Sequence, residues 1–268
     1  MAKKTKNVTH SLQQKWFDDH MASLVEGRYQ PFWRCQDVRS SGVKVKVPHF
    51  ADAYRVVHLF SINELLMYMT LSWDKSVNEI WEQYGLPLDE TSQIAMELGV
   101  KHPVYTDSKT PIVQTIDFIC NYADGSLKAY AVKQSSYLND SRTIEKLNIQ
   151  ERWCENNNIA FQVVTSDELK TVRCQNLEFL FYHRKLETLL KPVFNTWLSN
   201  FFGELSERVD DRAADILESS AELTGIPFQR AAHFFYYAIW KGVINFDWHQ
   251  PLALENPAST LEITSNDT

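Results

Sequence analysis

The chain has 268 residues, of which 44% are apolar and 13% aromatic, and this composition excludes a disordered protein. At about 100–200 residues per domain, the length fits one large domain or two ordinary ones. The formal net charge of -7 argues against a protein that coats nucleic acid or an anionic membrane. The charge is uneven, because residues 1–50 hold nine Lys and Arg against four Asp and Glu.

The spacing of the cysteines and the hydropathy of the chain indicate where in the cell the protein is located. The four cysteines, at positions 35, 120, 154 and 174, are too far apart for a close-spaced disulfide framework or a paired-thiolate zinc site. Residues 7–14 are mostly polar, so the basic N-terminus does not continue as a signal peptide. The longest strongly apolar stretch, 231–240, is about half of a membrane span. We expect a cytoplasmic protein that does not enter a membrane.

Helix and strand patterns alternate through the first part of the chain. Apolar spacing predicts helices over 11–26, 61–71, 88–98 and 141–156. Alternating and β-branched runs predict strands over 43–47, 54–60, 112–122, 127–133 and 159–164, whereas 77–84 is ambiguous. Asp124-Gly125 is a hairpin signal between two of these strands. The mixture predicts an α/β domain over 1–170, with a mixed sheet flanked by helices.

The pattern becomes mainly helical over 171–268. Helices are predicted over 177–190, 194–205, 211–223 and 228–241, followed by a short β-rich segment. A helix, a turn containing Gly225, a second helix and a β-rich tail have the order of a winged helix. Only Arg230 and Lys241 are basic on the second of these helices, so a protein-docking domain is an equally good interpretation.

Two residues of the predicted hairpin could carry chemistry. Asp117 interrupts an apolar strand, and a buried carboxylate without a partner is costly, so it must face solvent, a cation or a metal. Lys133 follows 16 residues later across the turn, which places the two side chains on adjacent strands within reach of one phosphate. The Val132 side chain points to the other face, and its backbone carbonyl can serve as a ligand. A plain cross-strand ion pair is the alternative interpretation.

A second acid is needed for a metal site that hydrolyses phosphodiesters, because Mg²⁺ prefers several hard oxygen ligands. Glu64, near the start of a helix predicted to pack on the sheet, fits this place. Ser61 and Glu64 also have the spacing of a capping box, which would explain the Glu without catalysis. We interpret His58, His102 and His233 as structural or surface histidines.

Several segments, in order along the chain, resemble the TnsA family, the endonuclease subunits of Tn7-type heteromeric transposases. The segments that carry the resemblance are Ser61-Ile62-Asn63-Glu64-Leu65, Gly99-Val100-Lys101-His102-Pro103-Val104, Thr115-Ile116-Asp117-Phe118, Val132-Lys133 and Thr143-Ile144-Glu145-Lys146-Leu147. The resemblance implies a restriction-endonuclease-like fold over 1–170 and a winged-helix-like domain over 171–268. It assigns the family's catalytic Glu, Asp and Lys to Glu64, Asp117 and Lys133.

The resemblance also implies a function. Family members cut the 5′ ends of the transposon, while an integrase-type transposase, TnsB, cuts the 3′ ends and an ATPase regulator, TnsC, binds the complex. We therefore expect a bacterial, Mg²⁺-dependent DNA endonuclease, with Mn²⁺ as a substitute. Glu64, Asp117 and the Val132 carbonyl would hold the metal, and Lys133 would orient water and steady transition-state charge. The alternatives are a DNA-binding scaffold with an inactive nuclease fold and a free-standing restriction or repair nuclease.

Two positions depart from the pattern of the family. Ala131 stands two residues before Lys133, where the nuclease motif has an acid or amide, and it offers no side-chain ligand. Gln150 replaces an acid of the family on the following helix. The basic N-terminal region is expected to contact transposon-end DNA, with a further contact from the second domain. The expected DNA-binding residues are Arg28, Arg34, Arg39, Lys44, Lys46 and Arg230.

Overall fold

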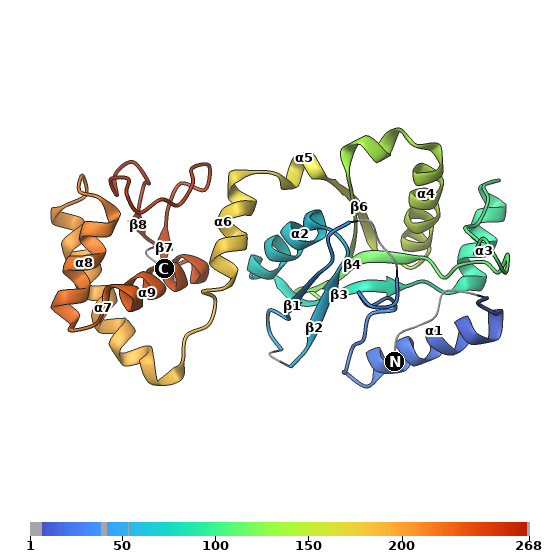
Figure 1. Ribbon diagram of the computed structural model, residues 1–268, viewed down its shortest axis with the longest axis horizontal. Helices are drawn as coiled ribbons and strands as arrows, with labels where there is room; N and C mark the ends of the chain where they lie inside the picture. The colour runs from blue at the N-terminus through green and yellow to red at the C-terminus, as the bar shows by residue number, and fades with distance from the viewer. Residues whose placement is uncertain (1–6, 39–41, 53, 267–268) are drawn as a thin grey trace. The chain divides into compact units, whose positions relative to one another are not determined.

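The computed structural model describes residues 7–38, 42–52 and 54–266. The described chain divides into two compact units, Met1–Leu169 and Lys170–Thr268 (Figure 1). Each unit has helices and strands of its own. The first unit contains, in chain order, α1 (His10–Val25), β1 (Val45–Pro48), β2 (Val56–Leu59), α2 (Ile62–Trp73), β3 (Val77–Gly85), α3 (Leu88–Glu97), β4 (Thr115–Tyr122), β5 (Leu127–Lys133), the 3-10 helix η1 (Ser135–Asn139), α4 (Ser141–Asn156), β6 (Ala160–Thr165) and α5 (Ser166–Leu169).

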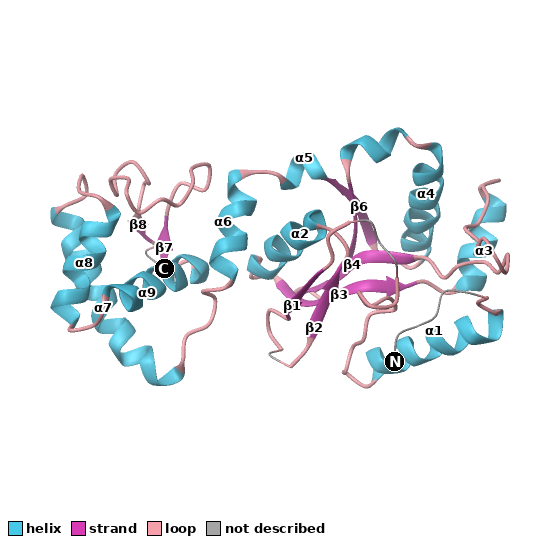
Figure 2. Cartoon of the chain, viewed as in Figure 1, coloured by secondary structure: helices cyan, strands magenta, loops and turns pink. Residues whose placement is uncertain are grey.

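The central sheet of this unit has the strand order β3–β4–β5–β6. β3 pairs antiparallel with β4, and β4 with β5, whereas β5 and β6 are parallel because α4 crosses over between them. β1 and β2 form a separate antiparallel hairpin. In Figure 2, α2 and α4 flank the sheet. This arrangement confirms the predicted α/β fold with a mixed sheet flanked by helices, and it assigns the ambiguous segment 77–84 to a strand.

Local sequence explains where the key elements begin. The Ser61 side chain accepts a hydrogen bond from the Glu64 amide and caps α2, while Asp140 caps α4 in the same way through the Thr143 amide. Gly125 has a φ of +82° in the turn between β4 and β5, a conformation that glycine adopts without strain. These signals fix the hairpin and the two helices that surround the candidate site.

Apolar side chains from the sheet, α3 and α4 form the core of the first unit. Burying such side chains is the main favourable contribution to folding, at roughly 25 cal/mol per Å² of apolar surface. The core holds the strands and α4 in a fixed register next to the candidate site. Its fully buried members include Leu86, Ile94, Ile116, Ile119, Ala129, Ile149 and Cys154.

The second unit is mainly helical and ends in a short antiparallel pair of strands. The predicted helix over 177–190 is wrong in its bounds, because the observed helix ends at Phe181. The buried Arg184 guanidinium donates to the Phe181 carbonyl and lies 3.7 Å from the Phe181 ring, which holds the chain out of the helix. The elements are α6 (Val172–Phe181), the 3-10 helix η2 (Thr188–Leu190), α7 (Lys191–Glu207), α8 (Ala213–Thr224), α9 (Phe228–Lys241), β7 (Ile244–Asn245) and β8 (Thr264–Ser265).

The winged-helix assignment of this unit stays a prediction. The helices α8 and α9 meet at Gly225, whose φ is +72°, and the β7–β8 pair follows α9. Over the described ranges, none of the helices is long and apolar enough to cross a membrane.

Candidate active site

Asp117 and Lys133 meet where the pairing of β4 with β5 ends. The last paired residues are Phe118 and Tyr130. Beyond them, a β5 backbone amide donates to the Asp117 side chain instead of to a backbone carbonyl of β4. Asp117 Oδ2 accepts hydrogen bonds from the Val132 amide at 2.7 Å and from Lys133 Nζ at 2.8 Å. Lys133 Nζ also donates to the Val132 carbonyl at 3.0 Å. The structure thus brings together the two side chains that the hairpin pattern placed on adjacent strands.

Glu64 lies in the first turn of α2 and is buried, with 7% of its surface exposed. Its carboxylate accepts hydrogen bonds from the Phe60 amide at 2.9 Å and from the Ser61 hydroxyl at 3.2 Å. Ser61 caps the helix through the Glu64 amide, but the Glu64 carboxylate accepts from the Phe60 amide rather than from the amide of Ser61, so only half of the predicted capping box forms. Within the described residues Glu64 makes no ion pair.

Electrostatics place Glu64 beside the Asp117–Lys133 pair. Burial, and next the negative charge of Asp117, raise the pKa of Glu64 to about 8, while Lys133 acts in the opposite direction. A carboxyl group that is costly to ionise beside a second negative charge is stabilised in its ionised form by a nearby cation. We call Glu64 and Asp117 the acidic pair.

A chain of hydrogen bonds through two glutamine side chains leads to the Glu64 carboxylate of the acidic pair. The sequence did not predict these contacts. Gln83 Nε2 donates to Glu64 Oε2 at 3.3 Å, and the Thr115 hydroxyl donates to Gln83 Oε1 at 3.1 Å. Gln150 Nε2 then donates to the Thr115 carbonyl at 2.9 Å. Gln83 has a φ of +50°, which is rare and strained for a residue other than glycine. The sequence around Gln83 has no clear strand pattern. The only signal for a role of Gln83 in the sequence is that it is a polar residue in that segment.

The donors at this site fit a hard divalent cation such as Mg²⁺. The acidic pair supplies two carboxylates, and the Val132 carbonyl lies beside Lys133. The buried Oε1 of Gln150 has no hydrogen-bond partner among the described residues. Ala131 is fully buried, so its methyl group occupies the position of the motif's missing ligand. Across the described part of the chain, no three His, Cys, Asp or Glu side chains gather into a metal-binding group. The set consists of two carboxylates and neutral oxygens.

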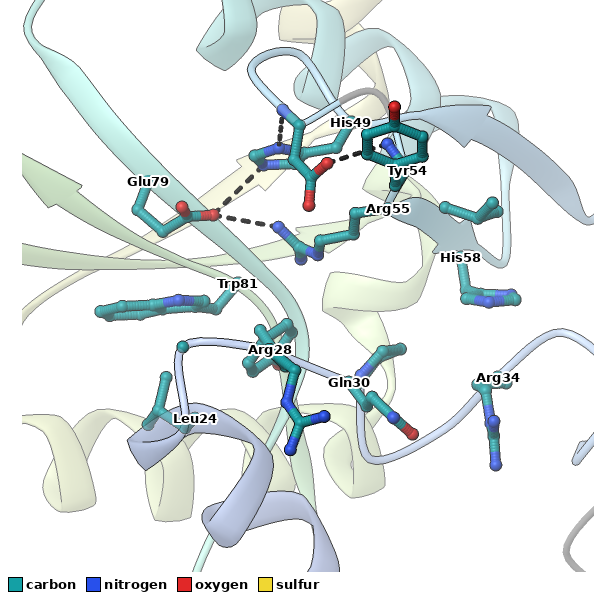
Figure 3. A pocket seen from close by; sticks show the side chains of 15 residues that line it. Leu24, Arg28, Gln30, Arg34, His49, Tyr54, Arg55, His58, Glu79 and Trp81 are labelled. Carbon is teal, nitrogen blue, oxygen red and sulfur yellow. Dashed lines mark hydrogen bonds and ion pairs between the residues drawn. The ribbon is translucent and has the colours of Figure 1, made fainter.

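Two of the predicted DNA contacts, Arg28 and Arg34, line a pocket of about 590 Å³ elsewhere in the first unit (Figure 3). Arg28 pairs with Glu26 at 2.6 Å on the surface, and Arg34 approaches Asp37 at 3.6 Å. On the other side of the pocket, Figure 3 shows the Glu79 carboxylate between Arg55 and a histidine.

The remaining predicted DNA contacts are dispersed. Lys44 is held within the unit, because its ammonium donates to the carbonyls of Cys35 and Val38. Lys46 is exposed on β1, and Arg230 is exposed on α9 in the other unit. Arg39 lies outside the described residues. The role of all six residues in binding DNA stays a prediction.

The mixed four-stranded sheet with helices on its flanks is consistent with the restriction-endonuclease-like class of fold. Residues 74–166 match the family described as "TnsA-like endonuclease N terminal", a range that contains Asp117 and Lys133 and begins after Glu64. The chain is 35% identical over 224 residues to the transposon Tn7 transposition protein TnsA of Escherichia coli, with 80% of each chain covered. The chain therefore belongs to the TnsA family of transposition endonucleases.

Proposed function

We propose that this protein is the DNA endonuclease subunit of a cut-and-paste transposase and hydrolyses the phosphodiester bonds at the 5′ ends of its transposon. The observation that carries the proposal is the buried acidic pair next to Lys133, in a chain of the TnsA family. The proposed place of action is the bacterial cytoplasm. TnsB-type and TnsC-type proteins are the proposed partners, and the second unit is the proposed surface for partner or DNA contact.

The site residues have distinct proposed roles. Glu64, Asp117 and the Val132 carbonyl would hold Mg²⁺, which would supply Lewis-acid stabilisation of the charge on the scissile phosphate. Lys133 uses two of its three N–H groups on Asp117 and the Val132 carbonyl, so a third remains to orient water or a phosphate oxygen. In-line attack by water on the phosphate would leave a 5′-phosphate and a 3′-hydroxyl.

Asp117 also acts on Lys133 as a positioning group. Its Oδ2 accepts both the Val132 amide and the Lys133 ammonium, so one carboxylate oxygen fixes the lysine against the end of β5. The amide chain from Gln83 holds Glu64 in the same manner. A site whose ligands are fixed in advance loses little energy to reorganisation during the reaction.

The decisive experiment compares variants in the assembled transposase, with Mg²⁺ and labelled transposon-end DNA. Asp117→Asn keeps an acceptor for Val132 and Lys133 but removes the charge, and we expect 5′-end cleavage to fall by about a thousandfold or more. The matched control is Asp124→Asn, an exposed carboxylate on the turn of the same hairpin, which should cleave normally.

Two outcomes would overturn the proposal. Full 5′-end cleavage by Asp117→Asn would show that the chemistry lies elsewhere. An absence of Mg²⁺-dependent 5′-end cleavage by the wild-type chain would favour the scaffold function, for which Ala131 is the structural argument. Retention of activity by Lys133→Ala would exclude only the role of the lysine.

A further inference from the structure

A second charged cavity lies in the first unit, between the loop that follows α3 and the first turns of α4. Its volume is about 620 Å³, and Lys101, Arg142, Glu145 and Lys146 are the charged residues that line it. Three cations face one carboxylate there. In a chain with a net charge of -7, such a local excess of positive charge requires an explanation.

The existing ion pairs do not satisfy this excess. Arg142 Nη1 pairs with Glu145 at 2.5 Å, so that carboxylate is already used. Lys101 and Lys146 are exposed, and neither makes an ion pair with any described residue. Asp140, the carboxylate that acts on Lys146, accepts hydrogen bonds from the Thr143 amide and hydroxyl at 2.8 Å.

The cavity is also close to the candidate active site. Partial burial lowers the pKa of Lys146, and the positive charges of Arg142 and Lys133 lower it further. The helix α4 begins at Ser141, eight residues after Lys133, so the same stretch of chain carries both groups. The charges of Lys146 and Lys133 therefore interact, which places this cavity near the candidate active site.

The walls of the cavity are fixed. The Arg142 guanidinium donates to the Lys101 carbonyl and ties the loop to α4. His102 Nε2 lies 3.2 Å from the Thr91 hydroxyl of α3, and the Ile112 amide donates to the Pro103 carbonyl at 2.8 Å. Burial lowers the pKa of His102, so this residue holds the loop as a neutral side chain. The cationic groups are thus attached to a rigid frame.

We propose that Lys101 and Lys146 bind the phosphate backbone of the substrate DNA on one flank of the scissile phosphate, with Arg142 as a positioning residue. The proposal rests on the proposed function and adds the surface that aligns the DNA with the acidic pair. Lys101 and Lys146 contact phosphates directly, and Arg142 positions Lys101 through the loop. Because these contacts are to phosphates, they fix register and add affinity without reading the base sequence.

Binding of the full-length chain to a fluorescent duplex, containing the transposon end and its flank, tests the proposal. Anisotropy is measured without Mg²⁺ over a range of salt concentrations, so no cleavage is needed. We expect the Lys101→Ala/Lys146→Ala variant to raise Kd roughly tenfold and to reduce the slope of log Kd against log salt by about 1.8, as for two lost phosphate contacts. Arg152→Ala removes an exposed, paired cation further along α4 and should match the wild type.

A neutral methylphosphonate placed at single positions beside the cut then locates the contact. One or two such positions should weaken binding of the wild type and leave binding of the double variant unchanged. The proposal is overturned if the double variant keeps the wild-type slope, or if the wild-type chain does not bind the duplex even at 25 mM salt. Failure of the proposed function would show differently, as normal binding by Asp117→Asn together with normal cleavage.

Discussion

The first unit has two clusters with buried carboxylates, and they differ in whether a cation contacts those carboxylates. The first is the Arg55 cluster, which consists of His49, Arg55, Glu79 and Glu82. The second is the acidic pair with the amide chain behind Glu64. Neighbouring residues of β3 contribute to the two clusters: Glu82 to the first and Gln83 to the second. The Arg55 guanidinium contacts both Glu79 and Glu82, although Glu82 is fully buried. Glu64 is almost as deeply buried but receives only amide and hydroxyl groups.

The difference is that one cluster contains a cation for its buried carboxylates, whereas Glu64 in the other has no cationic partner of its own. Burying carboxylates is tolerated when a cation is built into the protein, as at Arg55. The one lysine of this site pairs with Asp117, so Glu64 has no ion-pair partner among the described residues. Burial raises the pKa of both Glu64 and Glu82, and their direct partners, rather than the pKa values, distinguish the two sites.

Removal of the built-in cation should give the largest change in stability. Arg55→Ala would leave the buried Glu82 with the His58 amide but without its cation, and we expect the free energy of unfolding to fall by about 3–5 kcal/mol. Denaturant unfolding at pH 7 measures this, with Arg152→Ala, which breaks an exposed ion pair, changing stability by about 0.5 kcal/mol or less. A loss of similar size in both variants would contradict the claim that Arg55 compensates the buried charge of Glu82.

Glu64→Gln should raise the free energy of unfolding, in contrast to Arg55→Ala. The folded pKa of Glu64 is about 8, against an ordinary value of 4.5, so the folded chain keeps a proton that the unfolded chain loses. The stability associated with that proton is complete below about pH 4.5 and is lost as the pH rises toward 8.

In the absence of metal, Glu64→Gln should therefore stabilise the protein at pH 8, by an amount on the order of 3 kcal/mol, and flatten its stability between pH 5 and 8. Unfolding free energies measured across this pH range test the sign. Glu151→Gln, an exposed acid on α4, is the matched control and should follow the wild type. A Glu64→Gln variant that is less stable than the wild type at pH 8 would contradict the assignment of Glu64 as an uncompensated carboxylate.

A smaller effect is expected at Gln83. Its side chain joins Glu64 to Thr115, so Gln83→Ala leaves both groups short of a partner and should cost about 1–2 kcal/mol of stability. The cost is reduced at pH 5, where Glu64 is protonated and less dependent on a donor. If thermal unfolding shows the same loss at pH 5 and pH 8, the amide chain does not act on the charge of Glu64.

The sequence predicted the sheet and the hairpin because their signals are local. The Asp124-Gly125 turn and the alternating strands placed Asp117 near Lys133, and the Ser61–Glu64 spacing marked the start of α2. The segment of β3 carried no such signal, because its strand contains a residue with positive φ and is polar at Glu82 and Gln83.

The contacts that the sequence could not supply are long-range. The capture of the Val132 amide by Asp117 and the contact of Gln83 with Glu64 depend on how strands and helix meet. One local contact was missed as well: the buried Arg184, a residue typical of surfaces, packs on Phe181 three residues earlier, where α6 ends. In the basic N-terminal region, the sequence likewise did not reveal that Arg28 pairs with Glu26 or that Lys44 donates to the Cys35 carbonyl.

The affinity of the full chain for Mg²⁺ tests the central proposal, which is that the acidic pair binds a divalent cation. Isothermal titration calorimetry at pH 8 should detect binding to the wild type and to the Asp124→Asn control, and binding should weaken at pH 6 because Glu64 must release its proton. Glu64→Gln and Asp117→Asn should each weaken binding by about tenfold or more. Wild-type affinity in both variants would contradict the account.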